Sequence, residues 1–81
     1  MNLNKTDYIN KIDDIRKLGV KIAYLLKIQG FSQQKLAEKT GMSEIYLGAI
    51  ERGNANPTLW KLKLISEALE VEIDELFDFS L

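Results

Sequence analysis

The 81-residue sequence contains no cysteine and no histidine. Without cysteine it can form neither a disulfide framework nor a thiolate metal site, and without histidine it lacks the commonest acid-base group and metal ligand. It also lacks any apolar run near the roughly 18 residues that a membrane-spanning helix needs, and its first residues include no hydrophobic signal core. These absences predict a cytoplasmic protein with no metal, cofactor, small-molecule ligand or membrane contact.

The composition is that of one small folded domain. Apolar residues make up 46% of the chain and charged residues 28%, which is too apolar for a disordered tail. The length falls below the ~100 to 200 residues typical of a domain, so two modules cannot fit. No paired carboxylates lie in an apolar context, and we therefore do not expect an enzyme.

The charges are unevenly distributed along the chain. Residues 1–16 are neutral, residues 17–63 have a net charge of +5, and residues 64–81 have a net charge of −6. The basic middle segment is suited to face phosphates while the acidic end points elsewhere. The alternative interpretation is an ordinary solvated surface.

Apolar residues recur with helical spacing almost throughout, and no stretch alternates with period two. The sequence therefore predicts an all-α domain. Residues 6–28 form either one long helix or two abutting helices, and Gly19 is the expected break because glycine costs ~1 kcal/mol relative to alanine inside a helix. The apolar stripe of this segment comprises Tyr8, Ile12, Ile15, Gly19, Ile22 and Leu26.

Hydroxyl side chains predict where the remaining helices begin. Ser32, Ser43 and Thr58 are suited to cap helices over residues 33–39, 44–52 and 59–69. Gly30 is placed to end the first segment in a left-handed conformation. A last short helix is expected over residues 74–77, and Trp60 is expected to be half-buried in packing.

The second and third predicted helices have the spacing of a helix-turn-helix. Counted from Gln33, Ala37 lies at +4, where the crossing helix demands a small side chain, and Gly41 lies at +8, in the turn. Leu47 and Ile50 lie at +14 and +17 and anchor the second helix on the core. Positions 44, 45, 48, 49 and 52 are then expected to face outward.

From Phe31 to Phe77 the chain resembles the lambda Cro/C1 type, or XRE, helix-turn-helix family. The resemblance is specific because it combines Ser-Gln-x-x-Leu-Ala, Ile-Glu-Arg-Gly and Asn-Pro-Thr-Leu. It implies a five-helix, lambda-repressor-like DNA-binding domain over residues 18–81, with residues 1–17 as an N-terminal helical extension. Family members of this size include the controller proteins of restriction-modification systems, phage Cro-like repressors and some antitoxins.

Two positions depart from the family pattern. Leu26 stands where an arginine usually pairs with the position of Glu51, so Glu51 needs another partner. Arg52, Lys27 and backbone N–H groups near Asn54 are the candidates. Glu70 occupies a position that is usually a glycine C-cap, which implies a strained or differently closed turn.

The resemblance implies that residues 44–52 are a recognition helix that enters the major groove, and that Gln33 holds a phosphate. Glu44, Ile45 and Ala49 are the candidate base contacts, through cytosine N4 and thymine methyl groups. Glu44 has the alternative role of stabilising the helix N-terminus, and Ile45 that of covering Tyr46 or a partner surface. The candidate phosphate contacts are Ser32, Gln33, Ser43, Tyr46, Arg52, Asn54 and Asn56; for Arg52 an ion pair with Glu51 or a C-cap role remains open.

The sequence thus predicts a sequence-specific transcription regulator that binds double-stranded DNA as a homodimer on a two-half-site operator. Phe77, Phe79 and Leu81 place apolar side chains beyond the last helix and are the expected dimer interface; alternatively they fold back onto the core. The other function considered is a protein-binding module, such as an antitoxin or anti-repressor. Residues 44–49 contain neither arginine nor glutamine, and this poor content favours that alternative.

Overall fold

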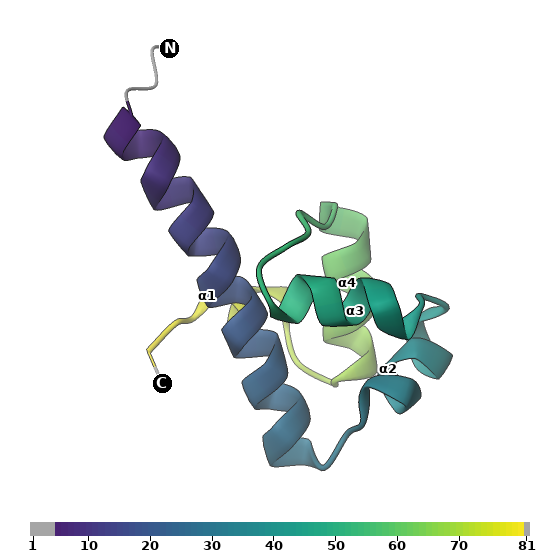
Figure 1. Ribbon diagram of the computed structural model, residues 1–81. Helices are drawn as coiled ribbons and strands as arrows, with labels where there is room; N and C mark the ends of the chain where they lie inside the picture. The colour runs from purple at the N-terminus through teal and green to yellow at the C-terminus, as the bar shows by residue number, and fades with distance from the viewer. Residues whose placement is uncertain (1–4, 81) are drawn as a thin grey trace.

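The computed structural model describes residues 5–80, with side chains from residue 13 onward. Within that range the chain is all-helical and has no strand. The elements are α1 (Lys5–Gln29), α2 (Gln33–Thr40), α3 (Glu44–Glu51), α4 (Leu59–Ala68) and a short 3-10 helix, η1 (Ile73–Phe77). Figure 1 shows α2, α3 and α4 grouped beside the C-terminal half of α1, whose N-terminal half extends beyond this group.

The predicted caps set the ends of the short helices. The hydroxyl oxygens of Ser32, Ser43 and Thr58 accept the backbone N–H groups of Lys35, Tyr46 and Lys61, at 3.0, 3.0 and 3.2 Å. Each bond satisfies one donor that the first helical turn leaves without an internal partner. The three predicted helix starts are therefore confirmed.

Helix α1 is continuous, and the predicted break at Gly19 is wrong. Gly19 is buried in the middle of α1, where the helix passes directly over the end of α3. A Cβ at this position would overlap the carbonyl oxygen of Ile50 and lie 2.7 Å from the carbonyl oxygen of Glu51. The glycine permits close approach of two helices, and it does not interrupt one. Gly30 ends α1 with a φ of 69°, as predicted.

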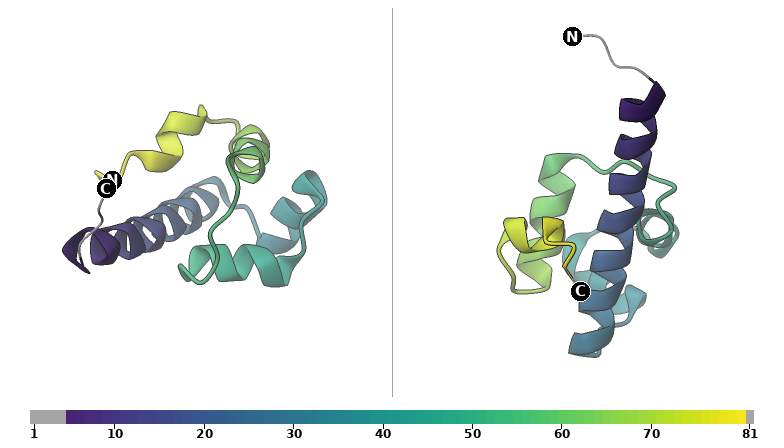
Figure 2. Two further views of the ribbon diagram at one scale, coloured as in Figure 1. Left: turned by 90° about the horizontal axis from the view of Figure 1, so that it is seen from above. Right: turned by 90° about the vertical axis from the view of Figure 1, so that its left-hand side faces the viewer.

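The core lies between α1 and the other helices. Figure 2 shows α3 on one side of the molecule, with α4 and η1 on the other. The most buried apolar side chains come from all five elements, so each contributes to one shared core. They include Ile22 of α1, Leu36 of α2, Leu47 and Ile50 of α3, Ile65 of α4 and Leu76 of η1.

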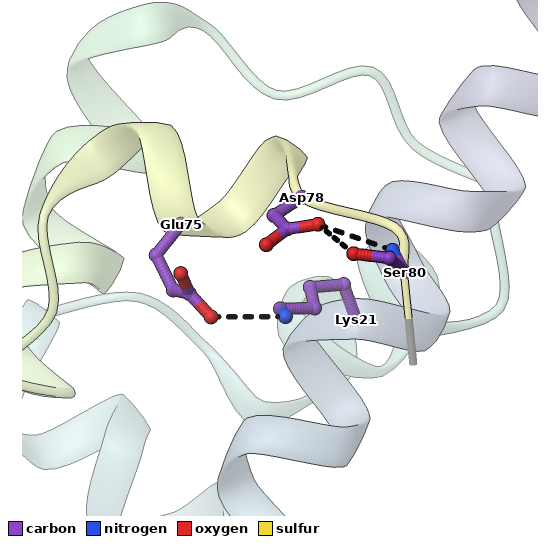
Figure 3. A network of polar contacts seen from close by, with 4 residues as sticks. All are labelled: Lys21, Glu75, Asp78 and Ser80. Atoms are coloured by element: carbon purple, nitrogen blue, oxygen red, sulfur yellow. Dashed lines mark hydrogen bonds and ion pairs between the residues drawn. The ribbon is translucent and has the colours of Figure 1, made fainter.

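The last short helix, expected over residues 74–77, is present as a 3-10 helix over Ile73–Phe77. It is held on α1 by the amine of Lys21, which is only 4% exposed and donates to Glu75 at 3.0 Å. In Figure 3 Asp78 lies on the η1 side of this amine, between Glu75 and Ser80. Hydrogen bonds from the hydroxyl and backbone N–H of Ser80 hold the pKa of Asp78 below its usual value. The buried side chain of Leu76 and the Lys21–Glu75 contact together attach η1 to the core.

The turn after α4 confirms the irregularity expected at Glu70. This residue has a φ of 56°, in the left-handed region, and the N–H of Val71 closes the turn on the carbonyl of Ser66 at 3.0 Å. Side chains with a Cβ are strained there, and glycine is not.

We expect Glu70→Gly to raise the free energy of unfolding by about 1 kcal/mol, because it removes that strain. The measurement is urea denaturation. As a control, Glu67→Gly on the exposed side of α4 makes the same chemical change and should lower stability by about 1 kcal/mol. A loss of stability for both variants would contradict the strain argument.

Candidate nucleic-acid interface

Helices α2 and α3 form the predicted hairpin. Gly41 has a φ of 76°, and its N–H donates to the carbonyl of Ala37 at 2.9 Å, which ends α2 and turns the chain toward α3. Leu47 and Ile50 are each 1% exposed and anchor α3 on the core. The hairpin geometry inferred from the spacing of these residues is confirmed.

The opposite face of α3 points to solvent. Glu44 and Arg52 are exposed, Ile45 is 85% exposed, and Ala49 is half-buried. Gly48 was also expected to face outward, but it is buried. It has no side chain of its own, and the side chains of Gln33 and Arg52 lie over it. The centre of the outer face of α3 therefore has no side chain of its own, and the ends of the Gln33 and Arg52 side chains cover this hollow.

The candidate phosphate contacts lie around the ends of α2 and α3. Ser32, Ser43, Asn54 and Asn56 are exposed, although both serine hydroxyls already accept backbone N–H groups as caps. Tyr46 is half-buried, with the amine of Lys61 lying 4.4 Å from the centre of its ring. These residues are thus accessible, or partly so, beside the outer face of α3.

The partner of Glu51 is Gln33, which was not among the three candidates considered. The side-chain nitrogen of Gln33 donates to the Glu51 carboxylate and thereby joins the start of α2 to the end of α3. Sequence reasoning assigned Gln33 to a phosphate and so missed this pair. The arginine missing at Leu26 was the signal that Glu51 had acquired a different partner.

Burial raises the pKa of Glu51 above its ordinary value of 4.5, against smaller opposing effects of Gln33 and Arg52. A carboxyl whose pKa is higher in the folded than in the unfolded state favours folding least when fully ionised. We therefore expect Glu51→Gln to stabilise the protein modestly at pH 7, with the gain disappearing as the pH falls below about 4.5, the ordinary value.

Thermal denaturation of both proteins between pH 3 and pH 7 measures this difference. Glu38→Gln on exposed α2 is the control and should change stability little at any of these pH values. A Glu51→Gln variant that loses stability at pH 7 would show that the ionised carboxylate is net favourable.

A shallow recess of about 250 Å³ opens at the hollow on α3. It is lined by Gln33, Glu44, Ile45, Gly48 and Arg52. One surface feature thus brings together residues from both helices of the hairpin. It offers a carboxylate, a guanidinium, an amide and one apolar side chain to a ligand.

Trp60 contradicts the sequence-based expectation of packing, because it is 70% exposed. Its neighbour Leu59 is equally exposed, and the two line an apolar groove with Lys63 and Ile73. The buried face of α4 is formed by Leu62 and Ile65, and Trp60 stands off that face.

Among the described residues, no group of acidic side chains is arranged to hold a metal ion. None of the helices in that part of the chain is both long and apolar enough to cross a membrane.

Comparison with known proteins identifies the family. The sequence model described as helix-turn-helix matches residues 22–76. The transcriptional regulator SlrR of Bacillus subtilis is 45% identical over 62 residues, which are 75% of this chain and 41% of SlrR. The uncharacterised regulator y4dJ of Sinorhizobium fredii is 39% identical over 64 residues, which are 78% of this chain and 83% of y4dJ. The chain thus spans less than half of SlrR but most of y4dJ.

Solved structures of helix-turn-helix regulators also match the fold of this chain. The restriction-modification controller protein C.AhdI of Aeromonas hydrophila superposes with a TM-score of 0.78 at 35% identity, covering 80% of this chain and 98% of C.AhdI. The controller protein C.Esp1396I, solved as a tetramer with its natural 35 base-pair operator, gives 0.72 at 31% identity, covering 79% of this chain and 84% of that one. With its capped α2–α3 hairpin and these matches, the chain belongs to the helix-turn-helix family of the XRE type.

Proposed function

We propose that this protein is a sequence-specific transcription regulator that binds double-stranded DNA as a homodimer, with α3 in the major groove. The observation that carries the proposal is the outer face of α3, which is presented to solvent by a capped hairpin anchored at Leu47 and Ile50. An α-helix that packs one face on its domain and presents the other to solvent in this way fits the major groove. The operator complex of C.Esp1396I supports the same role here.

In this proposal the residues of α3 and its surroundings divide into two groups. Glu44, Ile45 and Ala49 contact bases, since they stand on the outer face of α3. The backbone contacts surround them and fix the register of the protein on the duplex. They are Ser32, Gln33, Ser43, Tyr46, Arg52, Asn54 and Asn56.

The test is selection of bound sequences from a random duplex pool, followed by titration of the selected duplex at several salt concentrations. We expect a two-fold symmetric consensus, because one helix reads only a few base pairs and useful specificity needs two. Affinity should fall steeply with salt, because the release of counterions from the phosphates then favours binding less. No enrichment together with salt-independent binding would overturn the proposal.

One observation favours a second candidate, a protein-binding module such as an antitoxin or anti-repressor. Ile45 and Trp60 are large apolar side chains that are 85% and 70% exposed, which suits a protein partner. The selection experiment separates the two functions, since a protein-binding module would enrich no duplex.

For the dimer we propose an interface that includes Phe77, Phe79 and Leu81. Phe77 is 47% exposed and supports this role. Phe79 is half-buried against the core, which supports the alternative of folding back on the monomer. Leu81 lies outside the described residues.

We expect Phe77→Ala to shift the protein from dimer to monomer in sedimentation and to weaken operator binding about tenfold, because the half-sites are no longer linked. Ile28→Ala, which removes an exposed apolar side chain from α1, is the control and should leave the dimer intact. An unchanged sedimentation profile for Phe77→Ala would remove Phe77 from the interface.

The proposed domain comprises residues 18–81, with η1 in the place of the family's fifth helix. Residues 1–17 are the proposed N-terminal helical extension, of which residues 1–4 lie outside the described part of the chain. The family match, which begins at residue 22, supports this division. A regulator that acts on DNA without further chemistry is not an enzyme, and we assign it to the cytoplasm.

A further inference from the structure

The Gln33–Glu51 pair determines which hydrogen-bonding group Gln33 offers in the recess on α3. An ionised carboxylate can only accept hydrogen bonds, so it binds the nitrogen of the Gln33 amide and not its oxygen. With Glu51 in place the amide cannot turn over without losing this bond. The structure accordingly fixes which end of the Gln33 amide is available for other contacts.

The Gln33 oxygen and the Arg52 guanidinium meet above Gly48. A Cβ built on Gly48 would lie 3.0 Å from a terminal nitrogen of Arg52, 3.6 Å from the oxygen of Gln33 and 3.7 Å from its nitrogen. Of the two ends of the Gln33 amide, the nitrogen is already bonded to Glu51. Because position 48 has no side chain, an acceptor and a donor can both lie against the helix backbone there. Ile45 provides an apolar wall of the same recess.

These groups match one of the edges that base pairs present in the major groove. Adenine offers a donor, its N6 amino group, beside an acceptor, N7, while its thymine partner adds a methyl group. Guanine offers two acceptors, O6 and N7, and its O6 would face the oxygen of Gln33. An amide held in one orientation should thus accept adenine and reject guanine by repulsion.

We propose that the recess at Gly48 reads the major-groove edge of an adenine–thymine pair, with the Gln33 oxygen accepting from adenine N6 and Arg52 donating to N7. Glu51 acts as a positioning residue, because it orients Gln33 without touching the base. Ile45 contacts the thymine methyl group. This inference rests on the proposed DNA-binding function and adds to it the base that the hairpin distinguishes. It differs from that proposal at two residues, since it assigns Gln33 and Arg52 to a base and not to the phosphates.

The Gly48 backbone provides the first test. Gly48→Ala would place a methyl group in the recess, where it meets only the flexible ends of Arg52 and Gln33. The variant should fold at least as stably as the wild type, since alanine favours a helix more than glycine does. It should nevertheless lose the preference for adenine at one operator position.

The second test uses Glu51→Gln, with Glu38→Gln as the matched control that removes the same charge from α2. Each protein is titrated against the selected operator and against a copy in which the preferred adenine–thymine pair is replaced by guanine–cytosine. We expect at least about tenfold discrimination for the wild type and the control. For Glu51→Gln, whose side chain permits either orientation of Gln33, discrimination should fall to within about threefold. Affinity for unrelated duplex should change no more than it does in the control, because both variants lose one negative charge.

A third duplex with 7-deazaadenine at that position removes only the N7 acceptor. It should weaken wild-type binding and leave binding by Arg52→Ala unaffected. Undiminished discrimination in both Glu51→Gln and Gly48→Ala would overturn the inference and leave the proposed function standing. A selection that enriches no sequence would overturn the proposed function, and the inference with it.

Discussion

Gly19→Ala is expected to lower the free energy of unfolding by roughly 3 kcal/mol, at the upper end of what overpacking costs. The new Cβ would overlap the carbonyl oxygen of Ile50 and lie 2.7 Å from that of Glu51. Both atoms belong to the backbone of α3 and cannot turn aside. To relieve the contact, α3 must move away from α1 and give up part of the core around Leu47 and Ile50.

The sign of this effect distinguishes packing from helix propensity. On propensity alone, alanine in place of a glycine in the middle of a helix would stabilise the protein by about 1 kcal/mol. Chemical denaturation of Gly19→Ala measures the balance, and Val20→Ala at the adjoining exposed position of α1 is the control. A Gly19→Ala variant as stable as the wild type would show that α1 and α3 do not approach as closely as described.

The second large effect is expected at the Lys21–Glu75 pair. Lys21 is only 4% exposed, and its amine donates to Glu75 at 3.0 Å. Glu75→Ala leaves the buried ammonium without its hydrogen-bonded carboxylate. We expect a loss of about 2 kcal/mol, less than the ~3 to 5 kcal/mol for a fully buried pair, because Glu75 remains partly exposed and Asp78 lies nearby.

Lys21→Met is the matched control, since it retains the aliphatic chain and removes the charge. It should alter stability by less than about 1 kcal/mol. The double variant Lys21→Met, Glu75→Ala should then be more stable than Glu75→Ala alone, a non-additivity that urea denaturation of the four proteins detects. Strictly additive losses would mean that the pair contributes nothing to the attachment of η1.

Local signals in the sequence determined the helical elements. Ser32, Ser43 and Thr58 stand where side-chain oxygens satisfy the first N–H groups of α2, α3 and α4, and these bonds span only three residues. The left-handed turns at Gly30 and Gly41 are equally local. The spacing of Leu47 and Ile50 likewise fixed which face of α3 is buried, because helical periodicity needs no knowledge of the partner.

Contacts between residues far apart in the sequence could not be read in this way. Gly19 has the sequence signature of a helix break, and only the position of the α3 carbonyls shows that it is a point of close approach. A tryptophan such as Trp60 is typical of a packing position, but here the side chains of Leu62 and Ile65 form the buried face of α4 and Trp60 is exposed.

The candidate site divides along the same line. By itself the sequence predicted that positions 44, 45, 48, 49 and 52 face outward, since this follows from α-helical geometry alone. The structure exposes Glu44, Ile45 and Arg52, leaves Ala49 half-buried and buries Gly48. Only the tertiary structure decided that Gln33 pairs with Glu51, 18 residues away, and so presents its oxygen above Gly48. The physical reason is that the orientation of the Gln33 amide depends on the group that it contacts on another helix. The packing of α2 against α3 decides that this group is the Glu51 carboxylate.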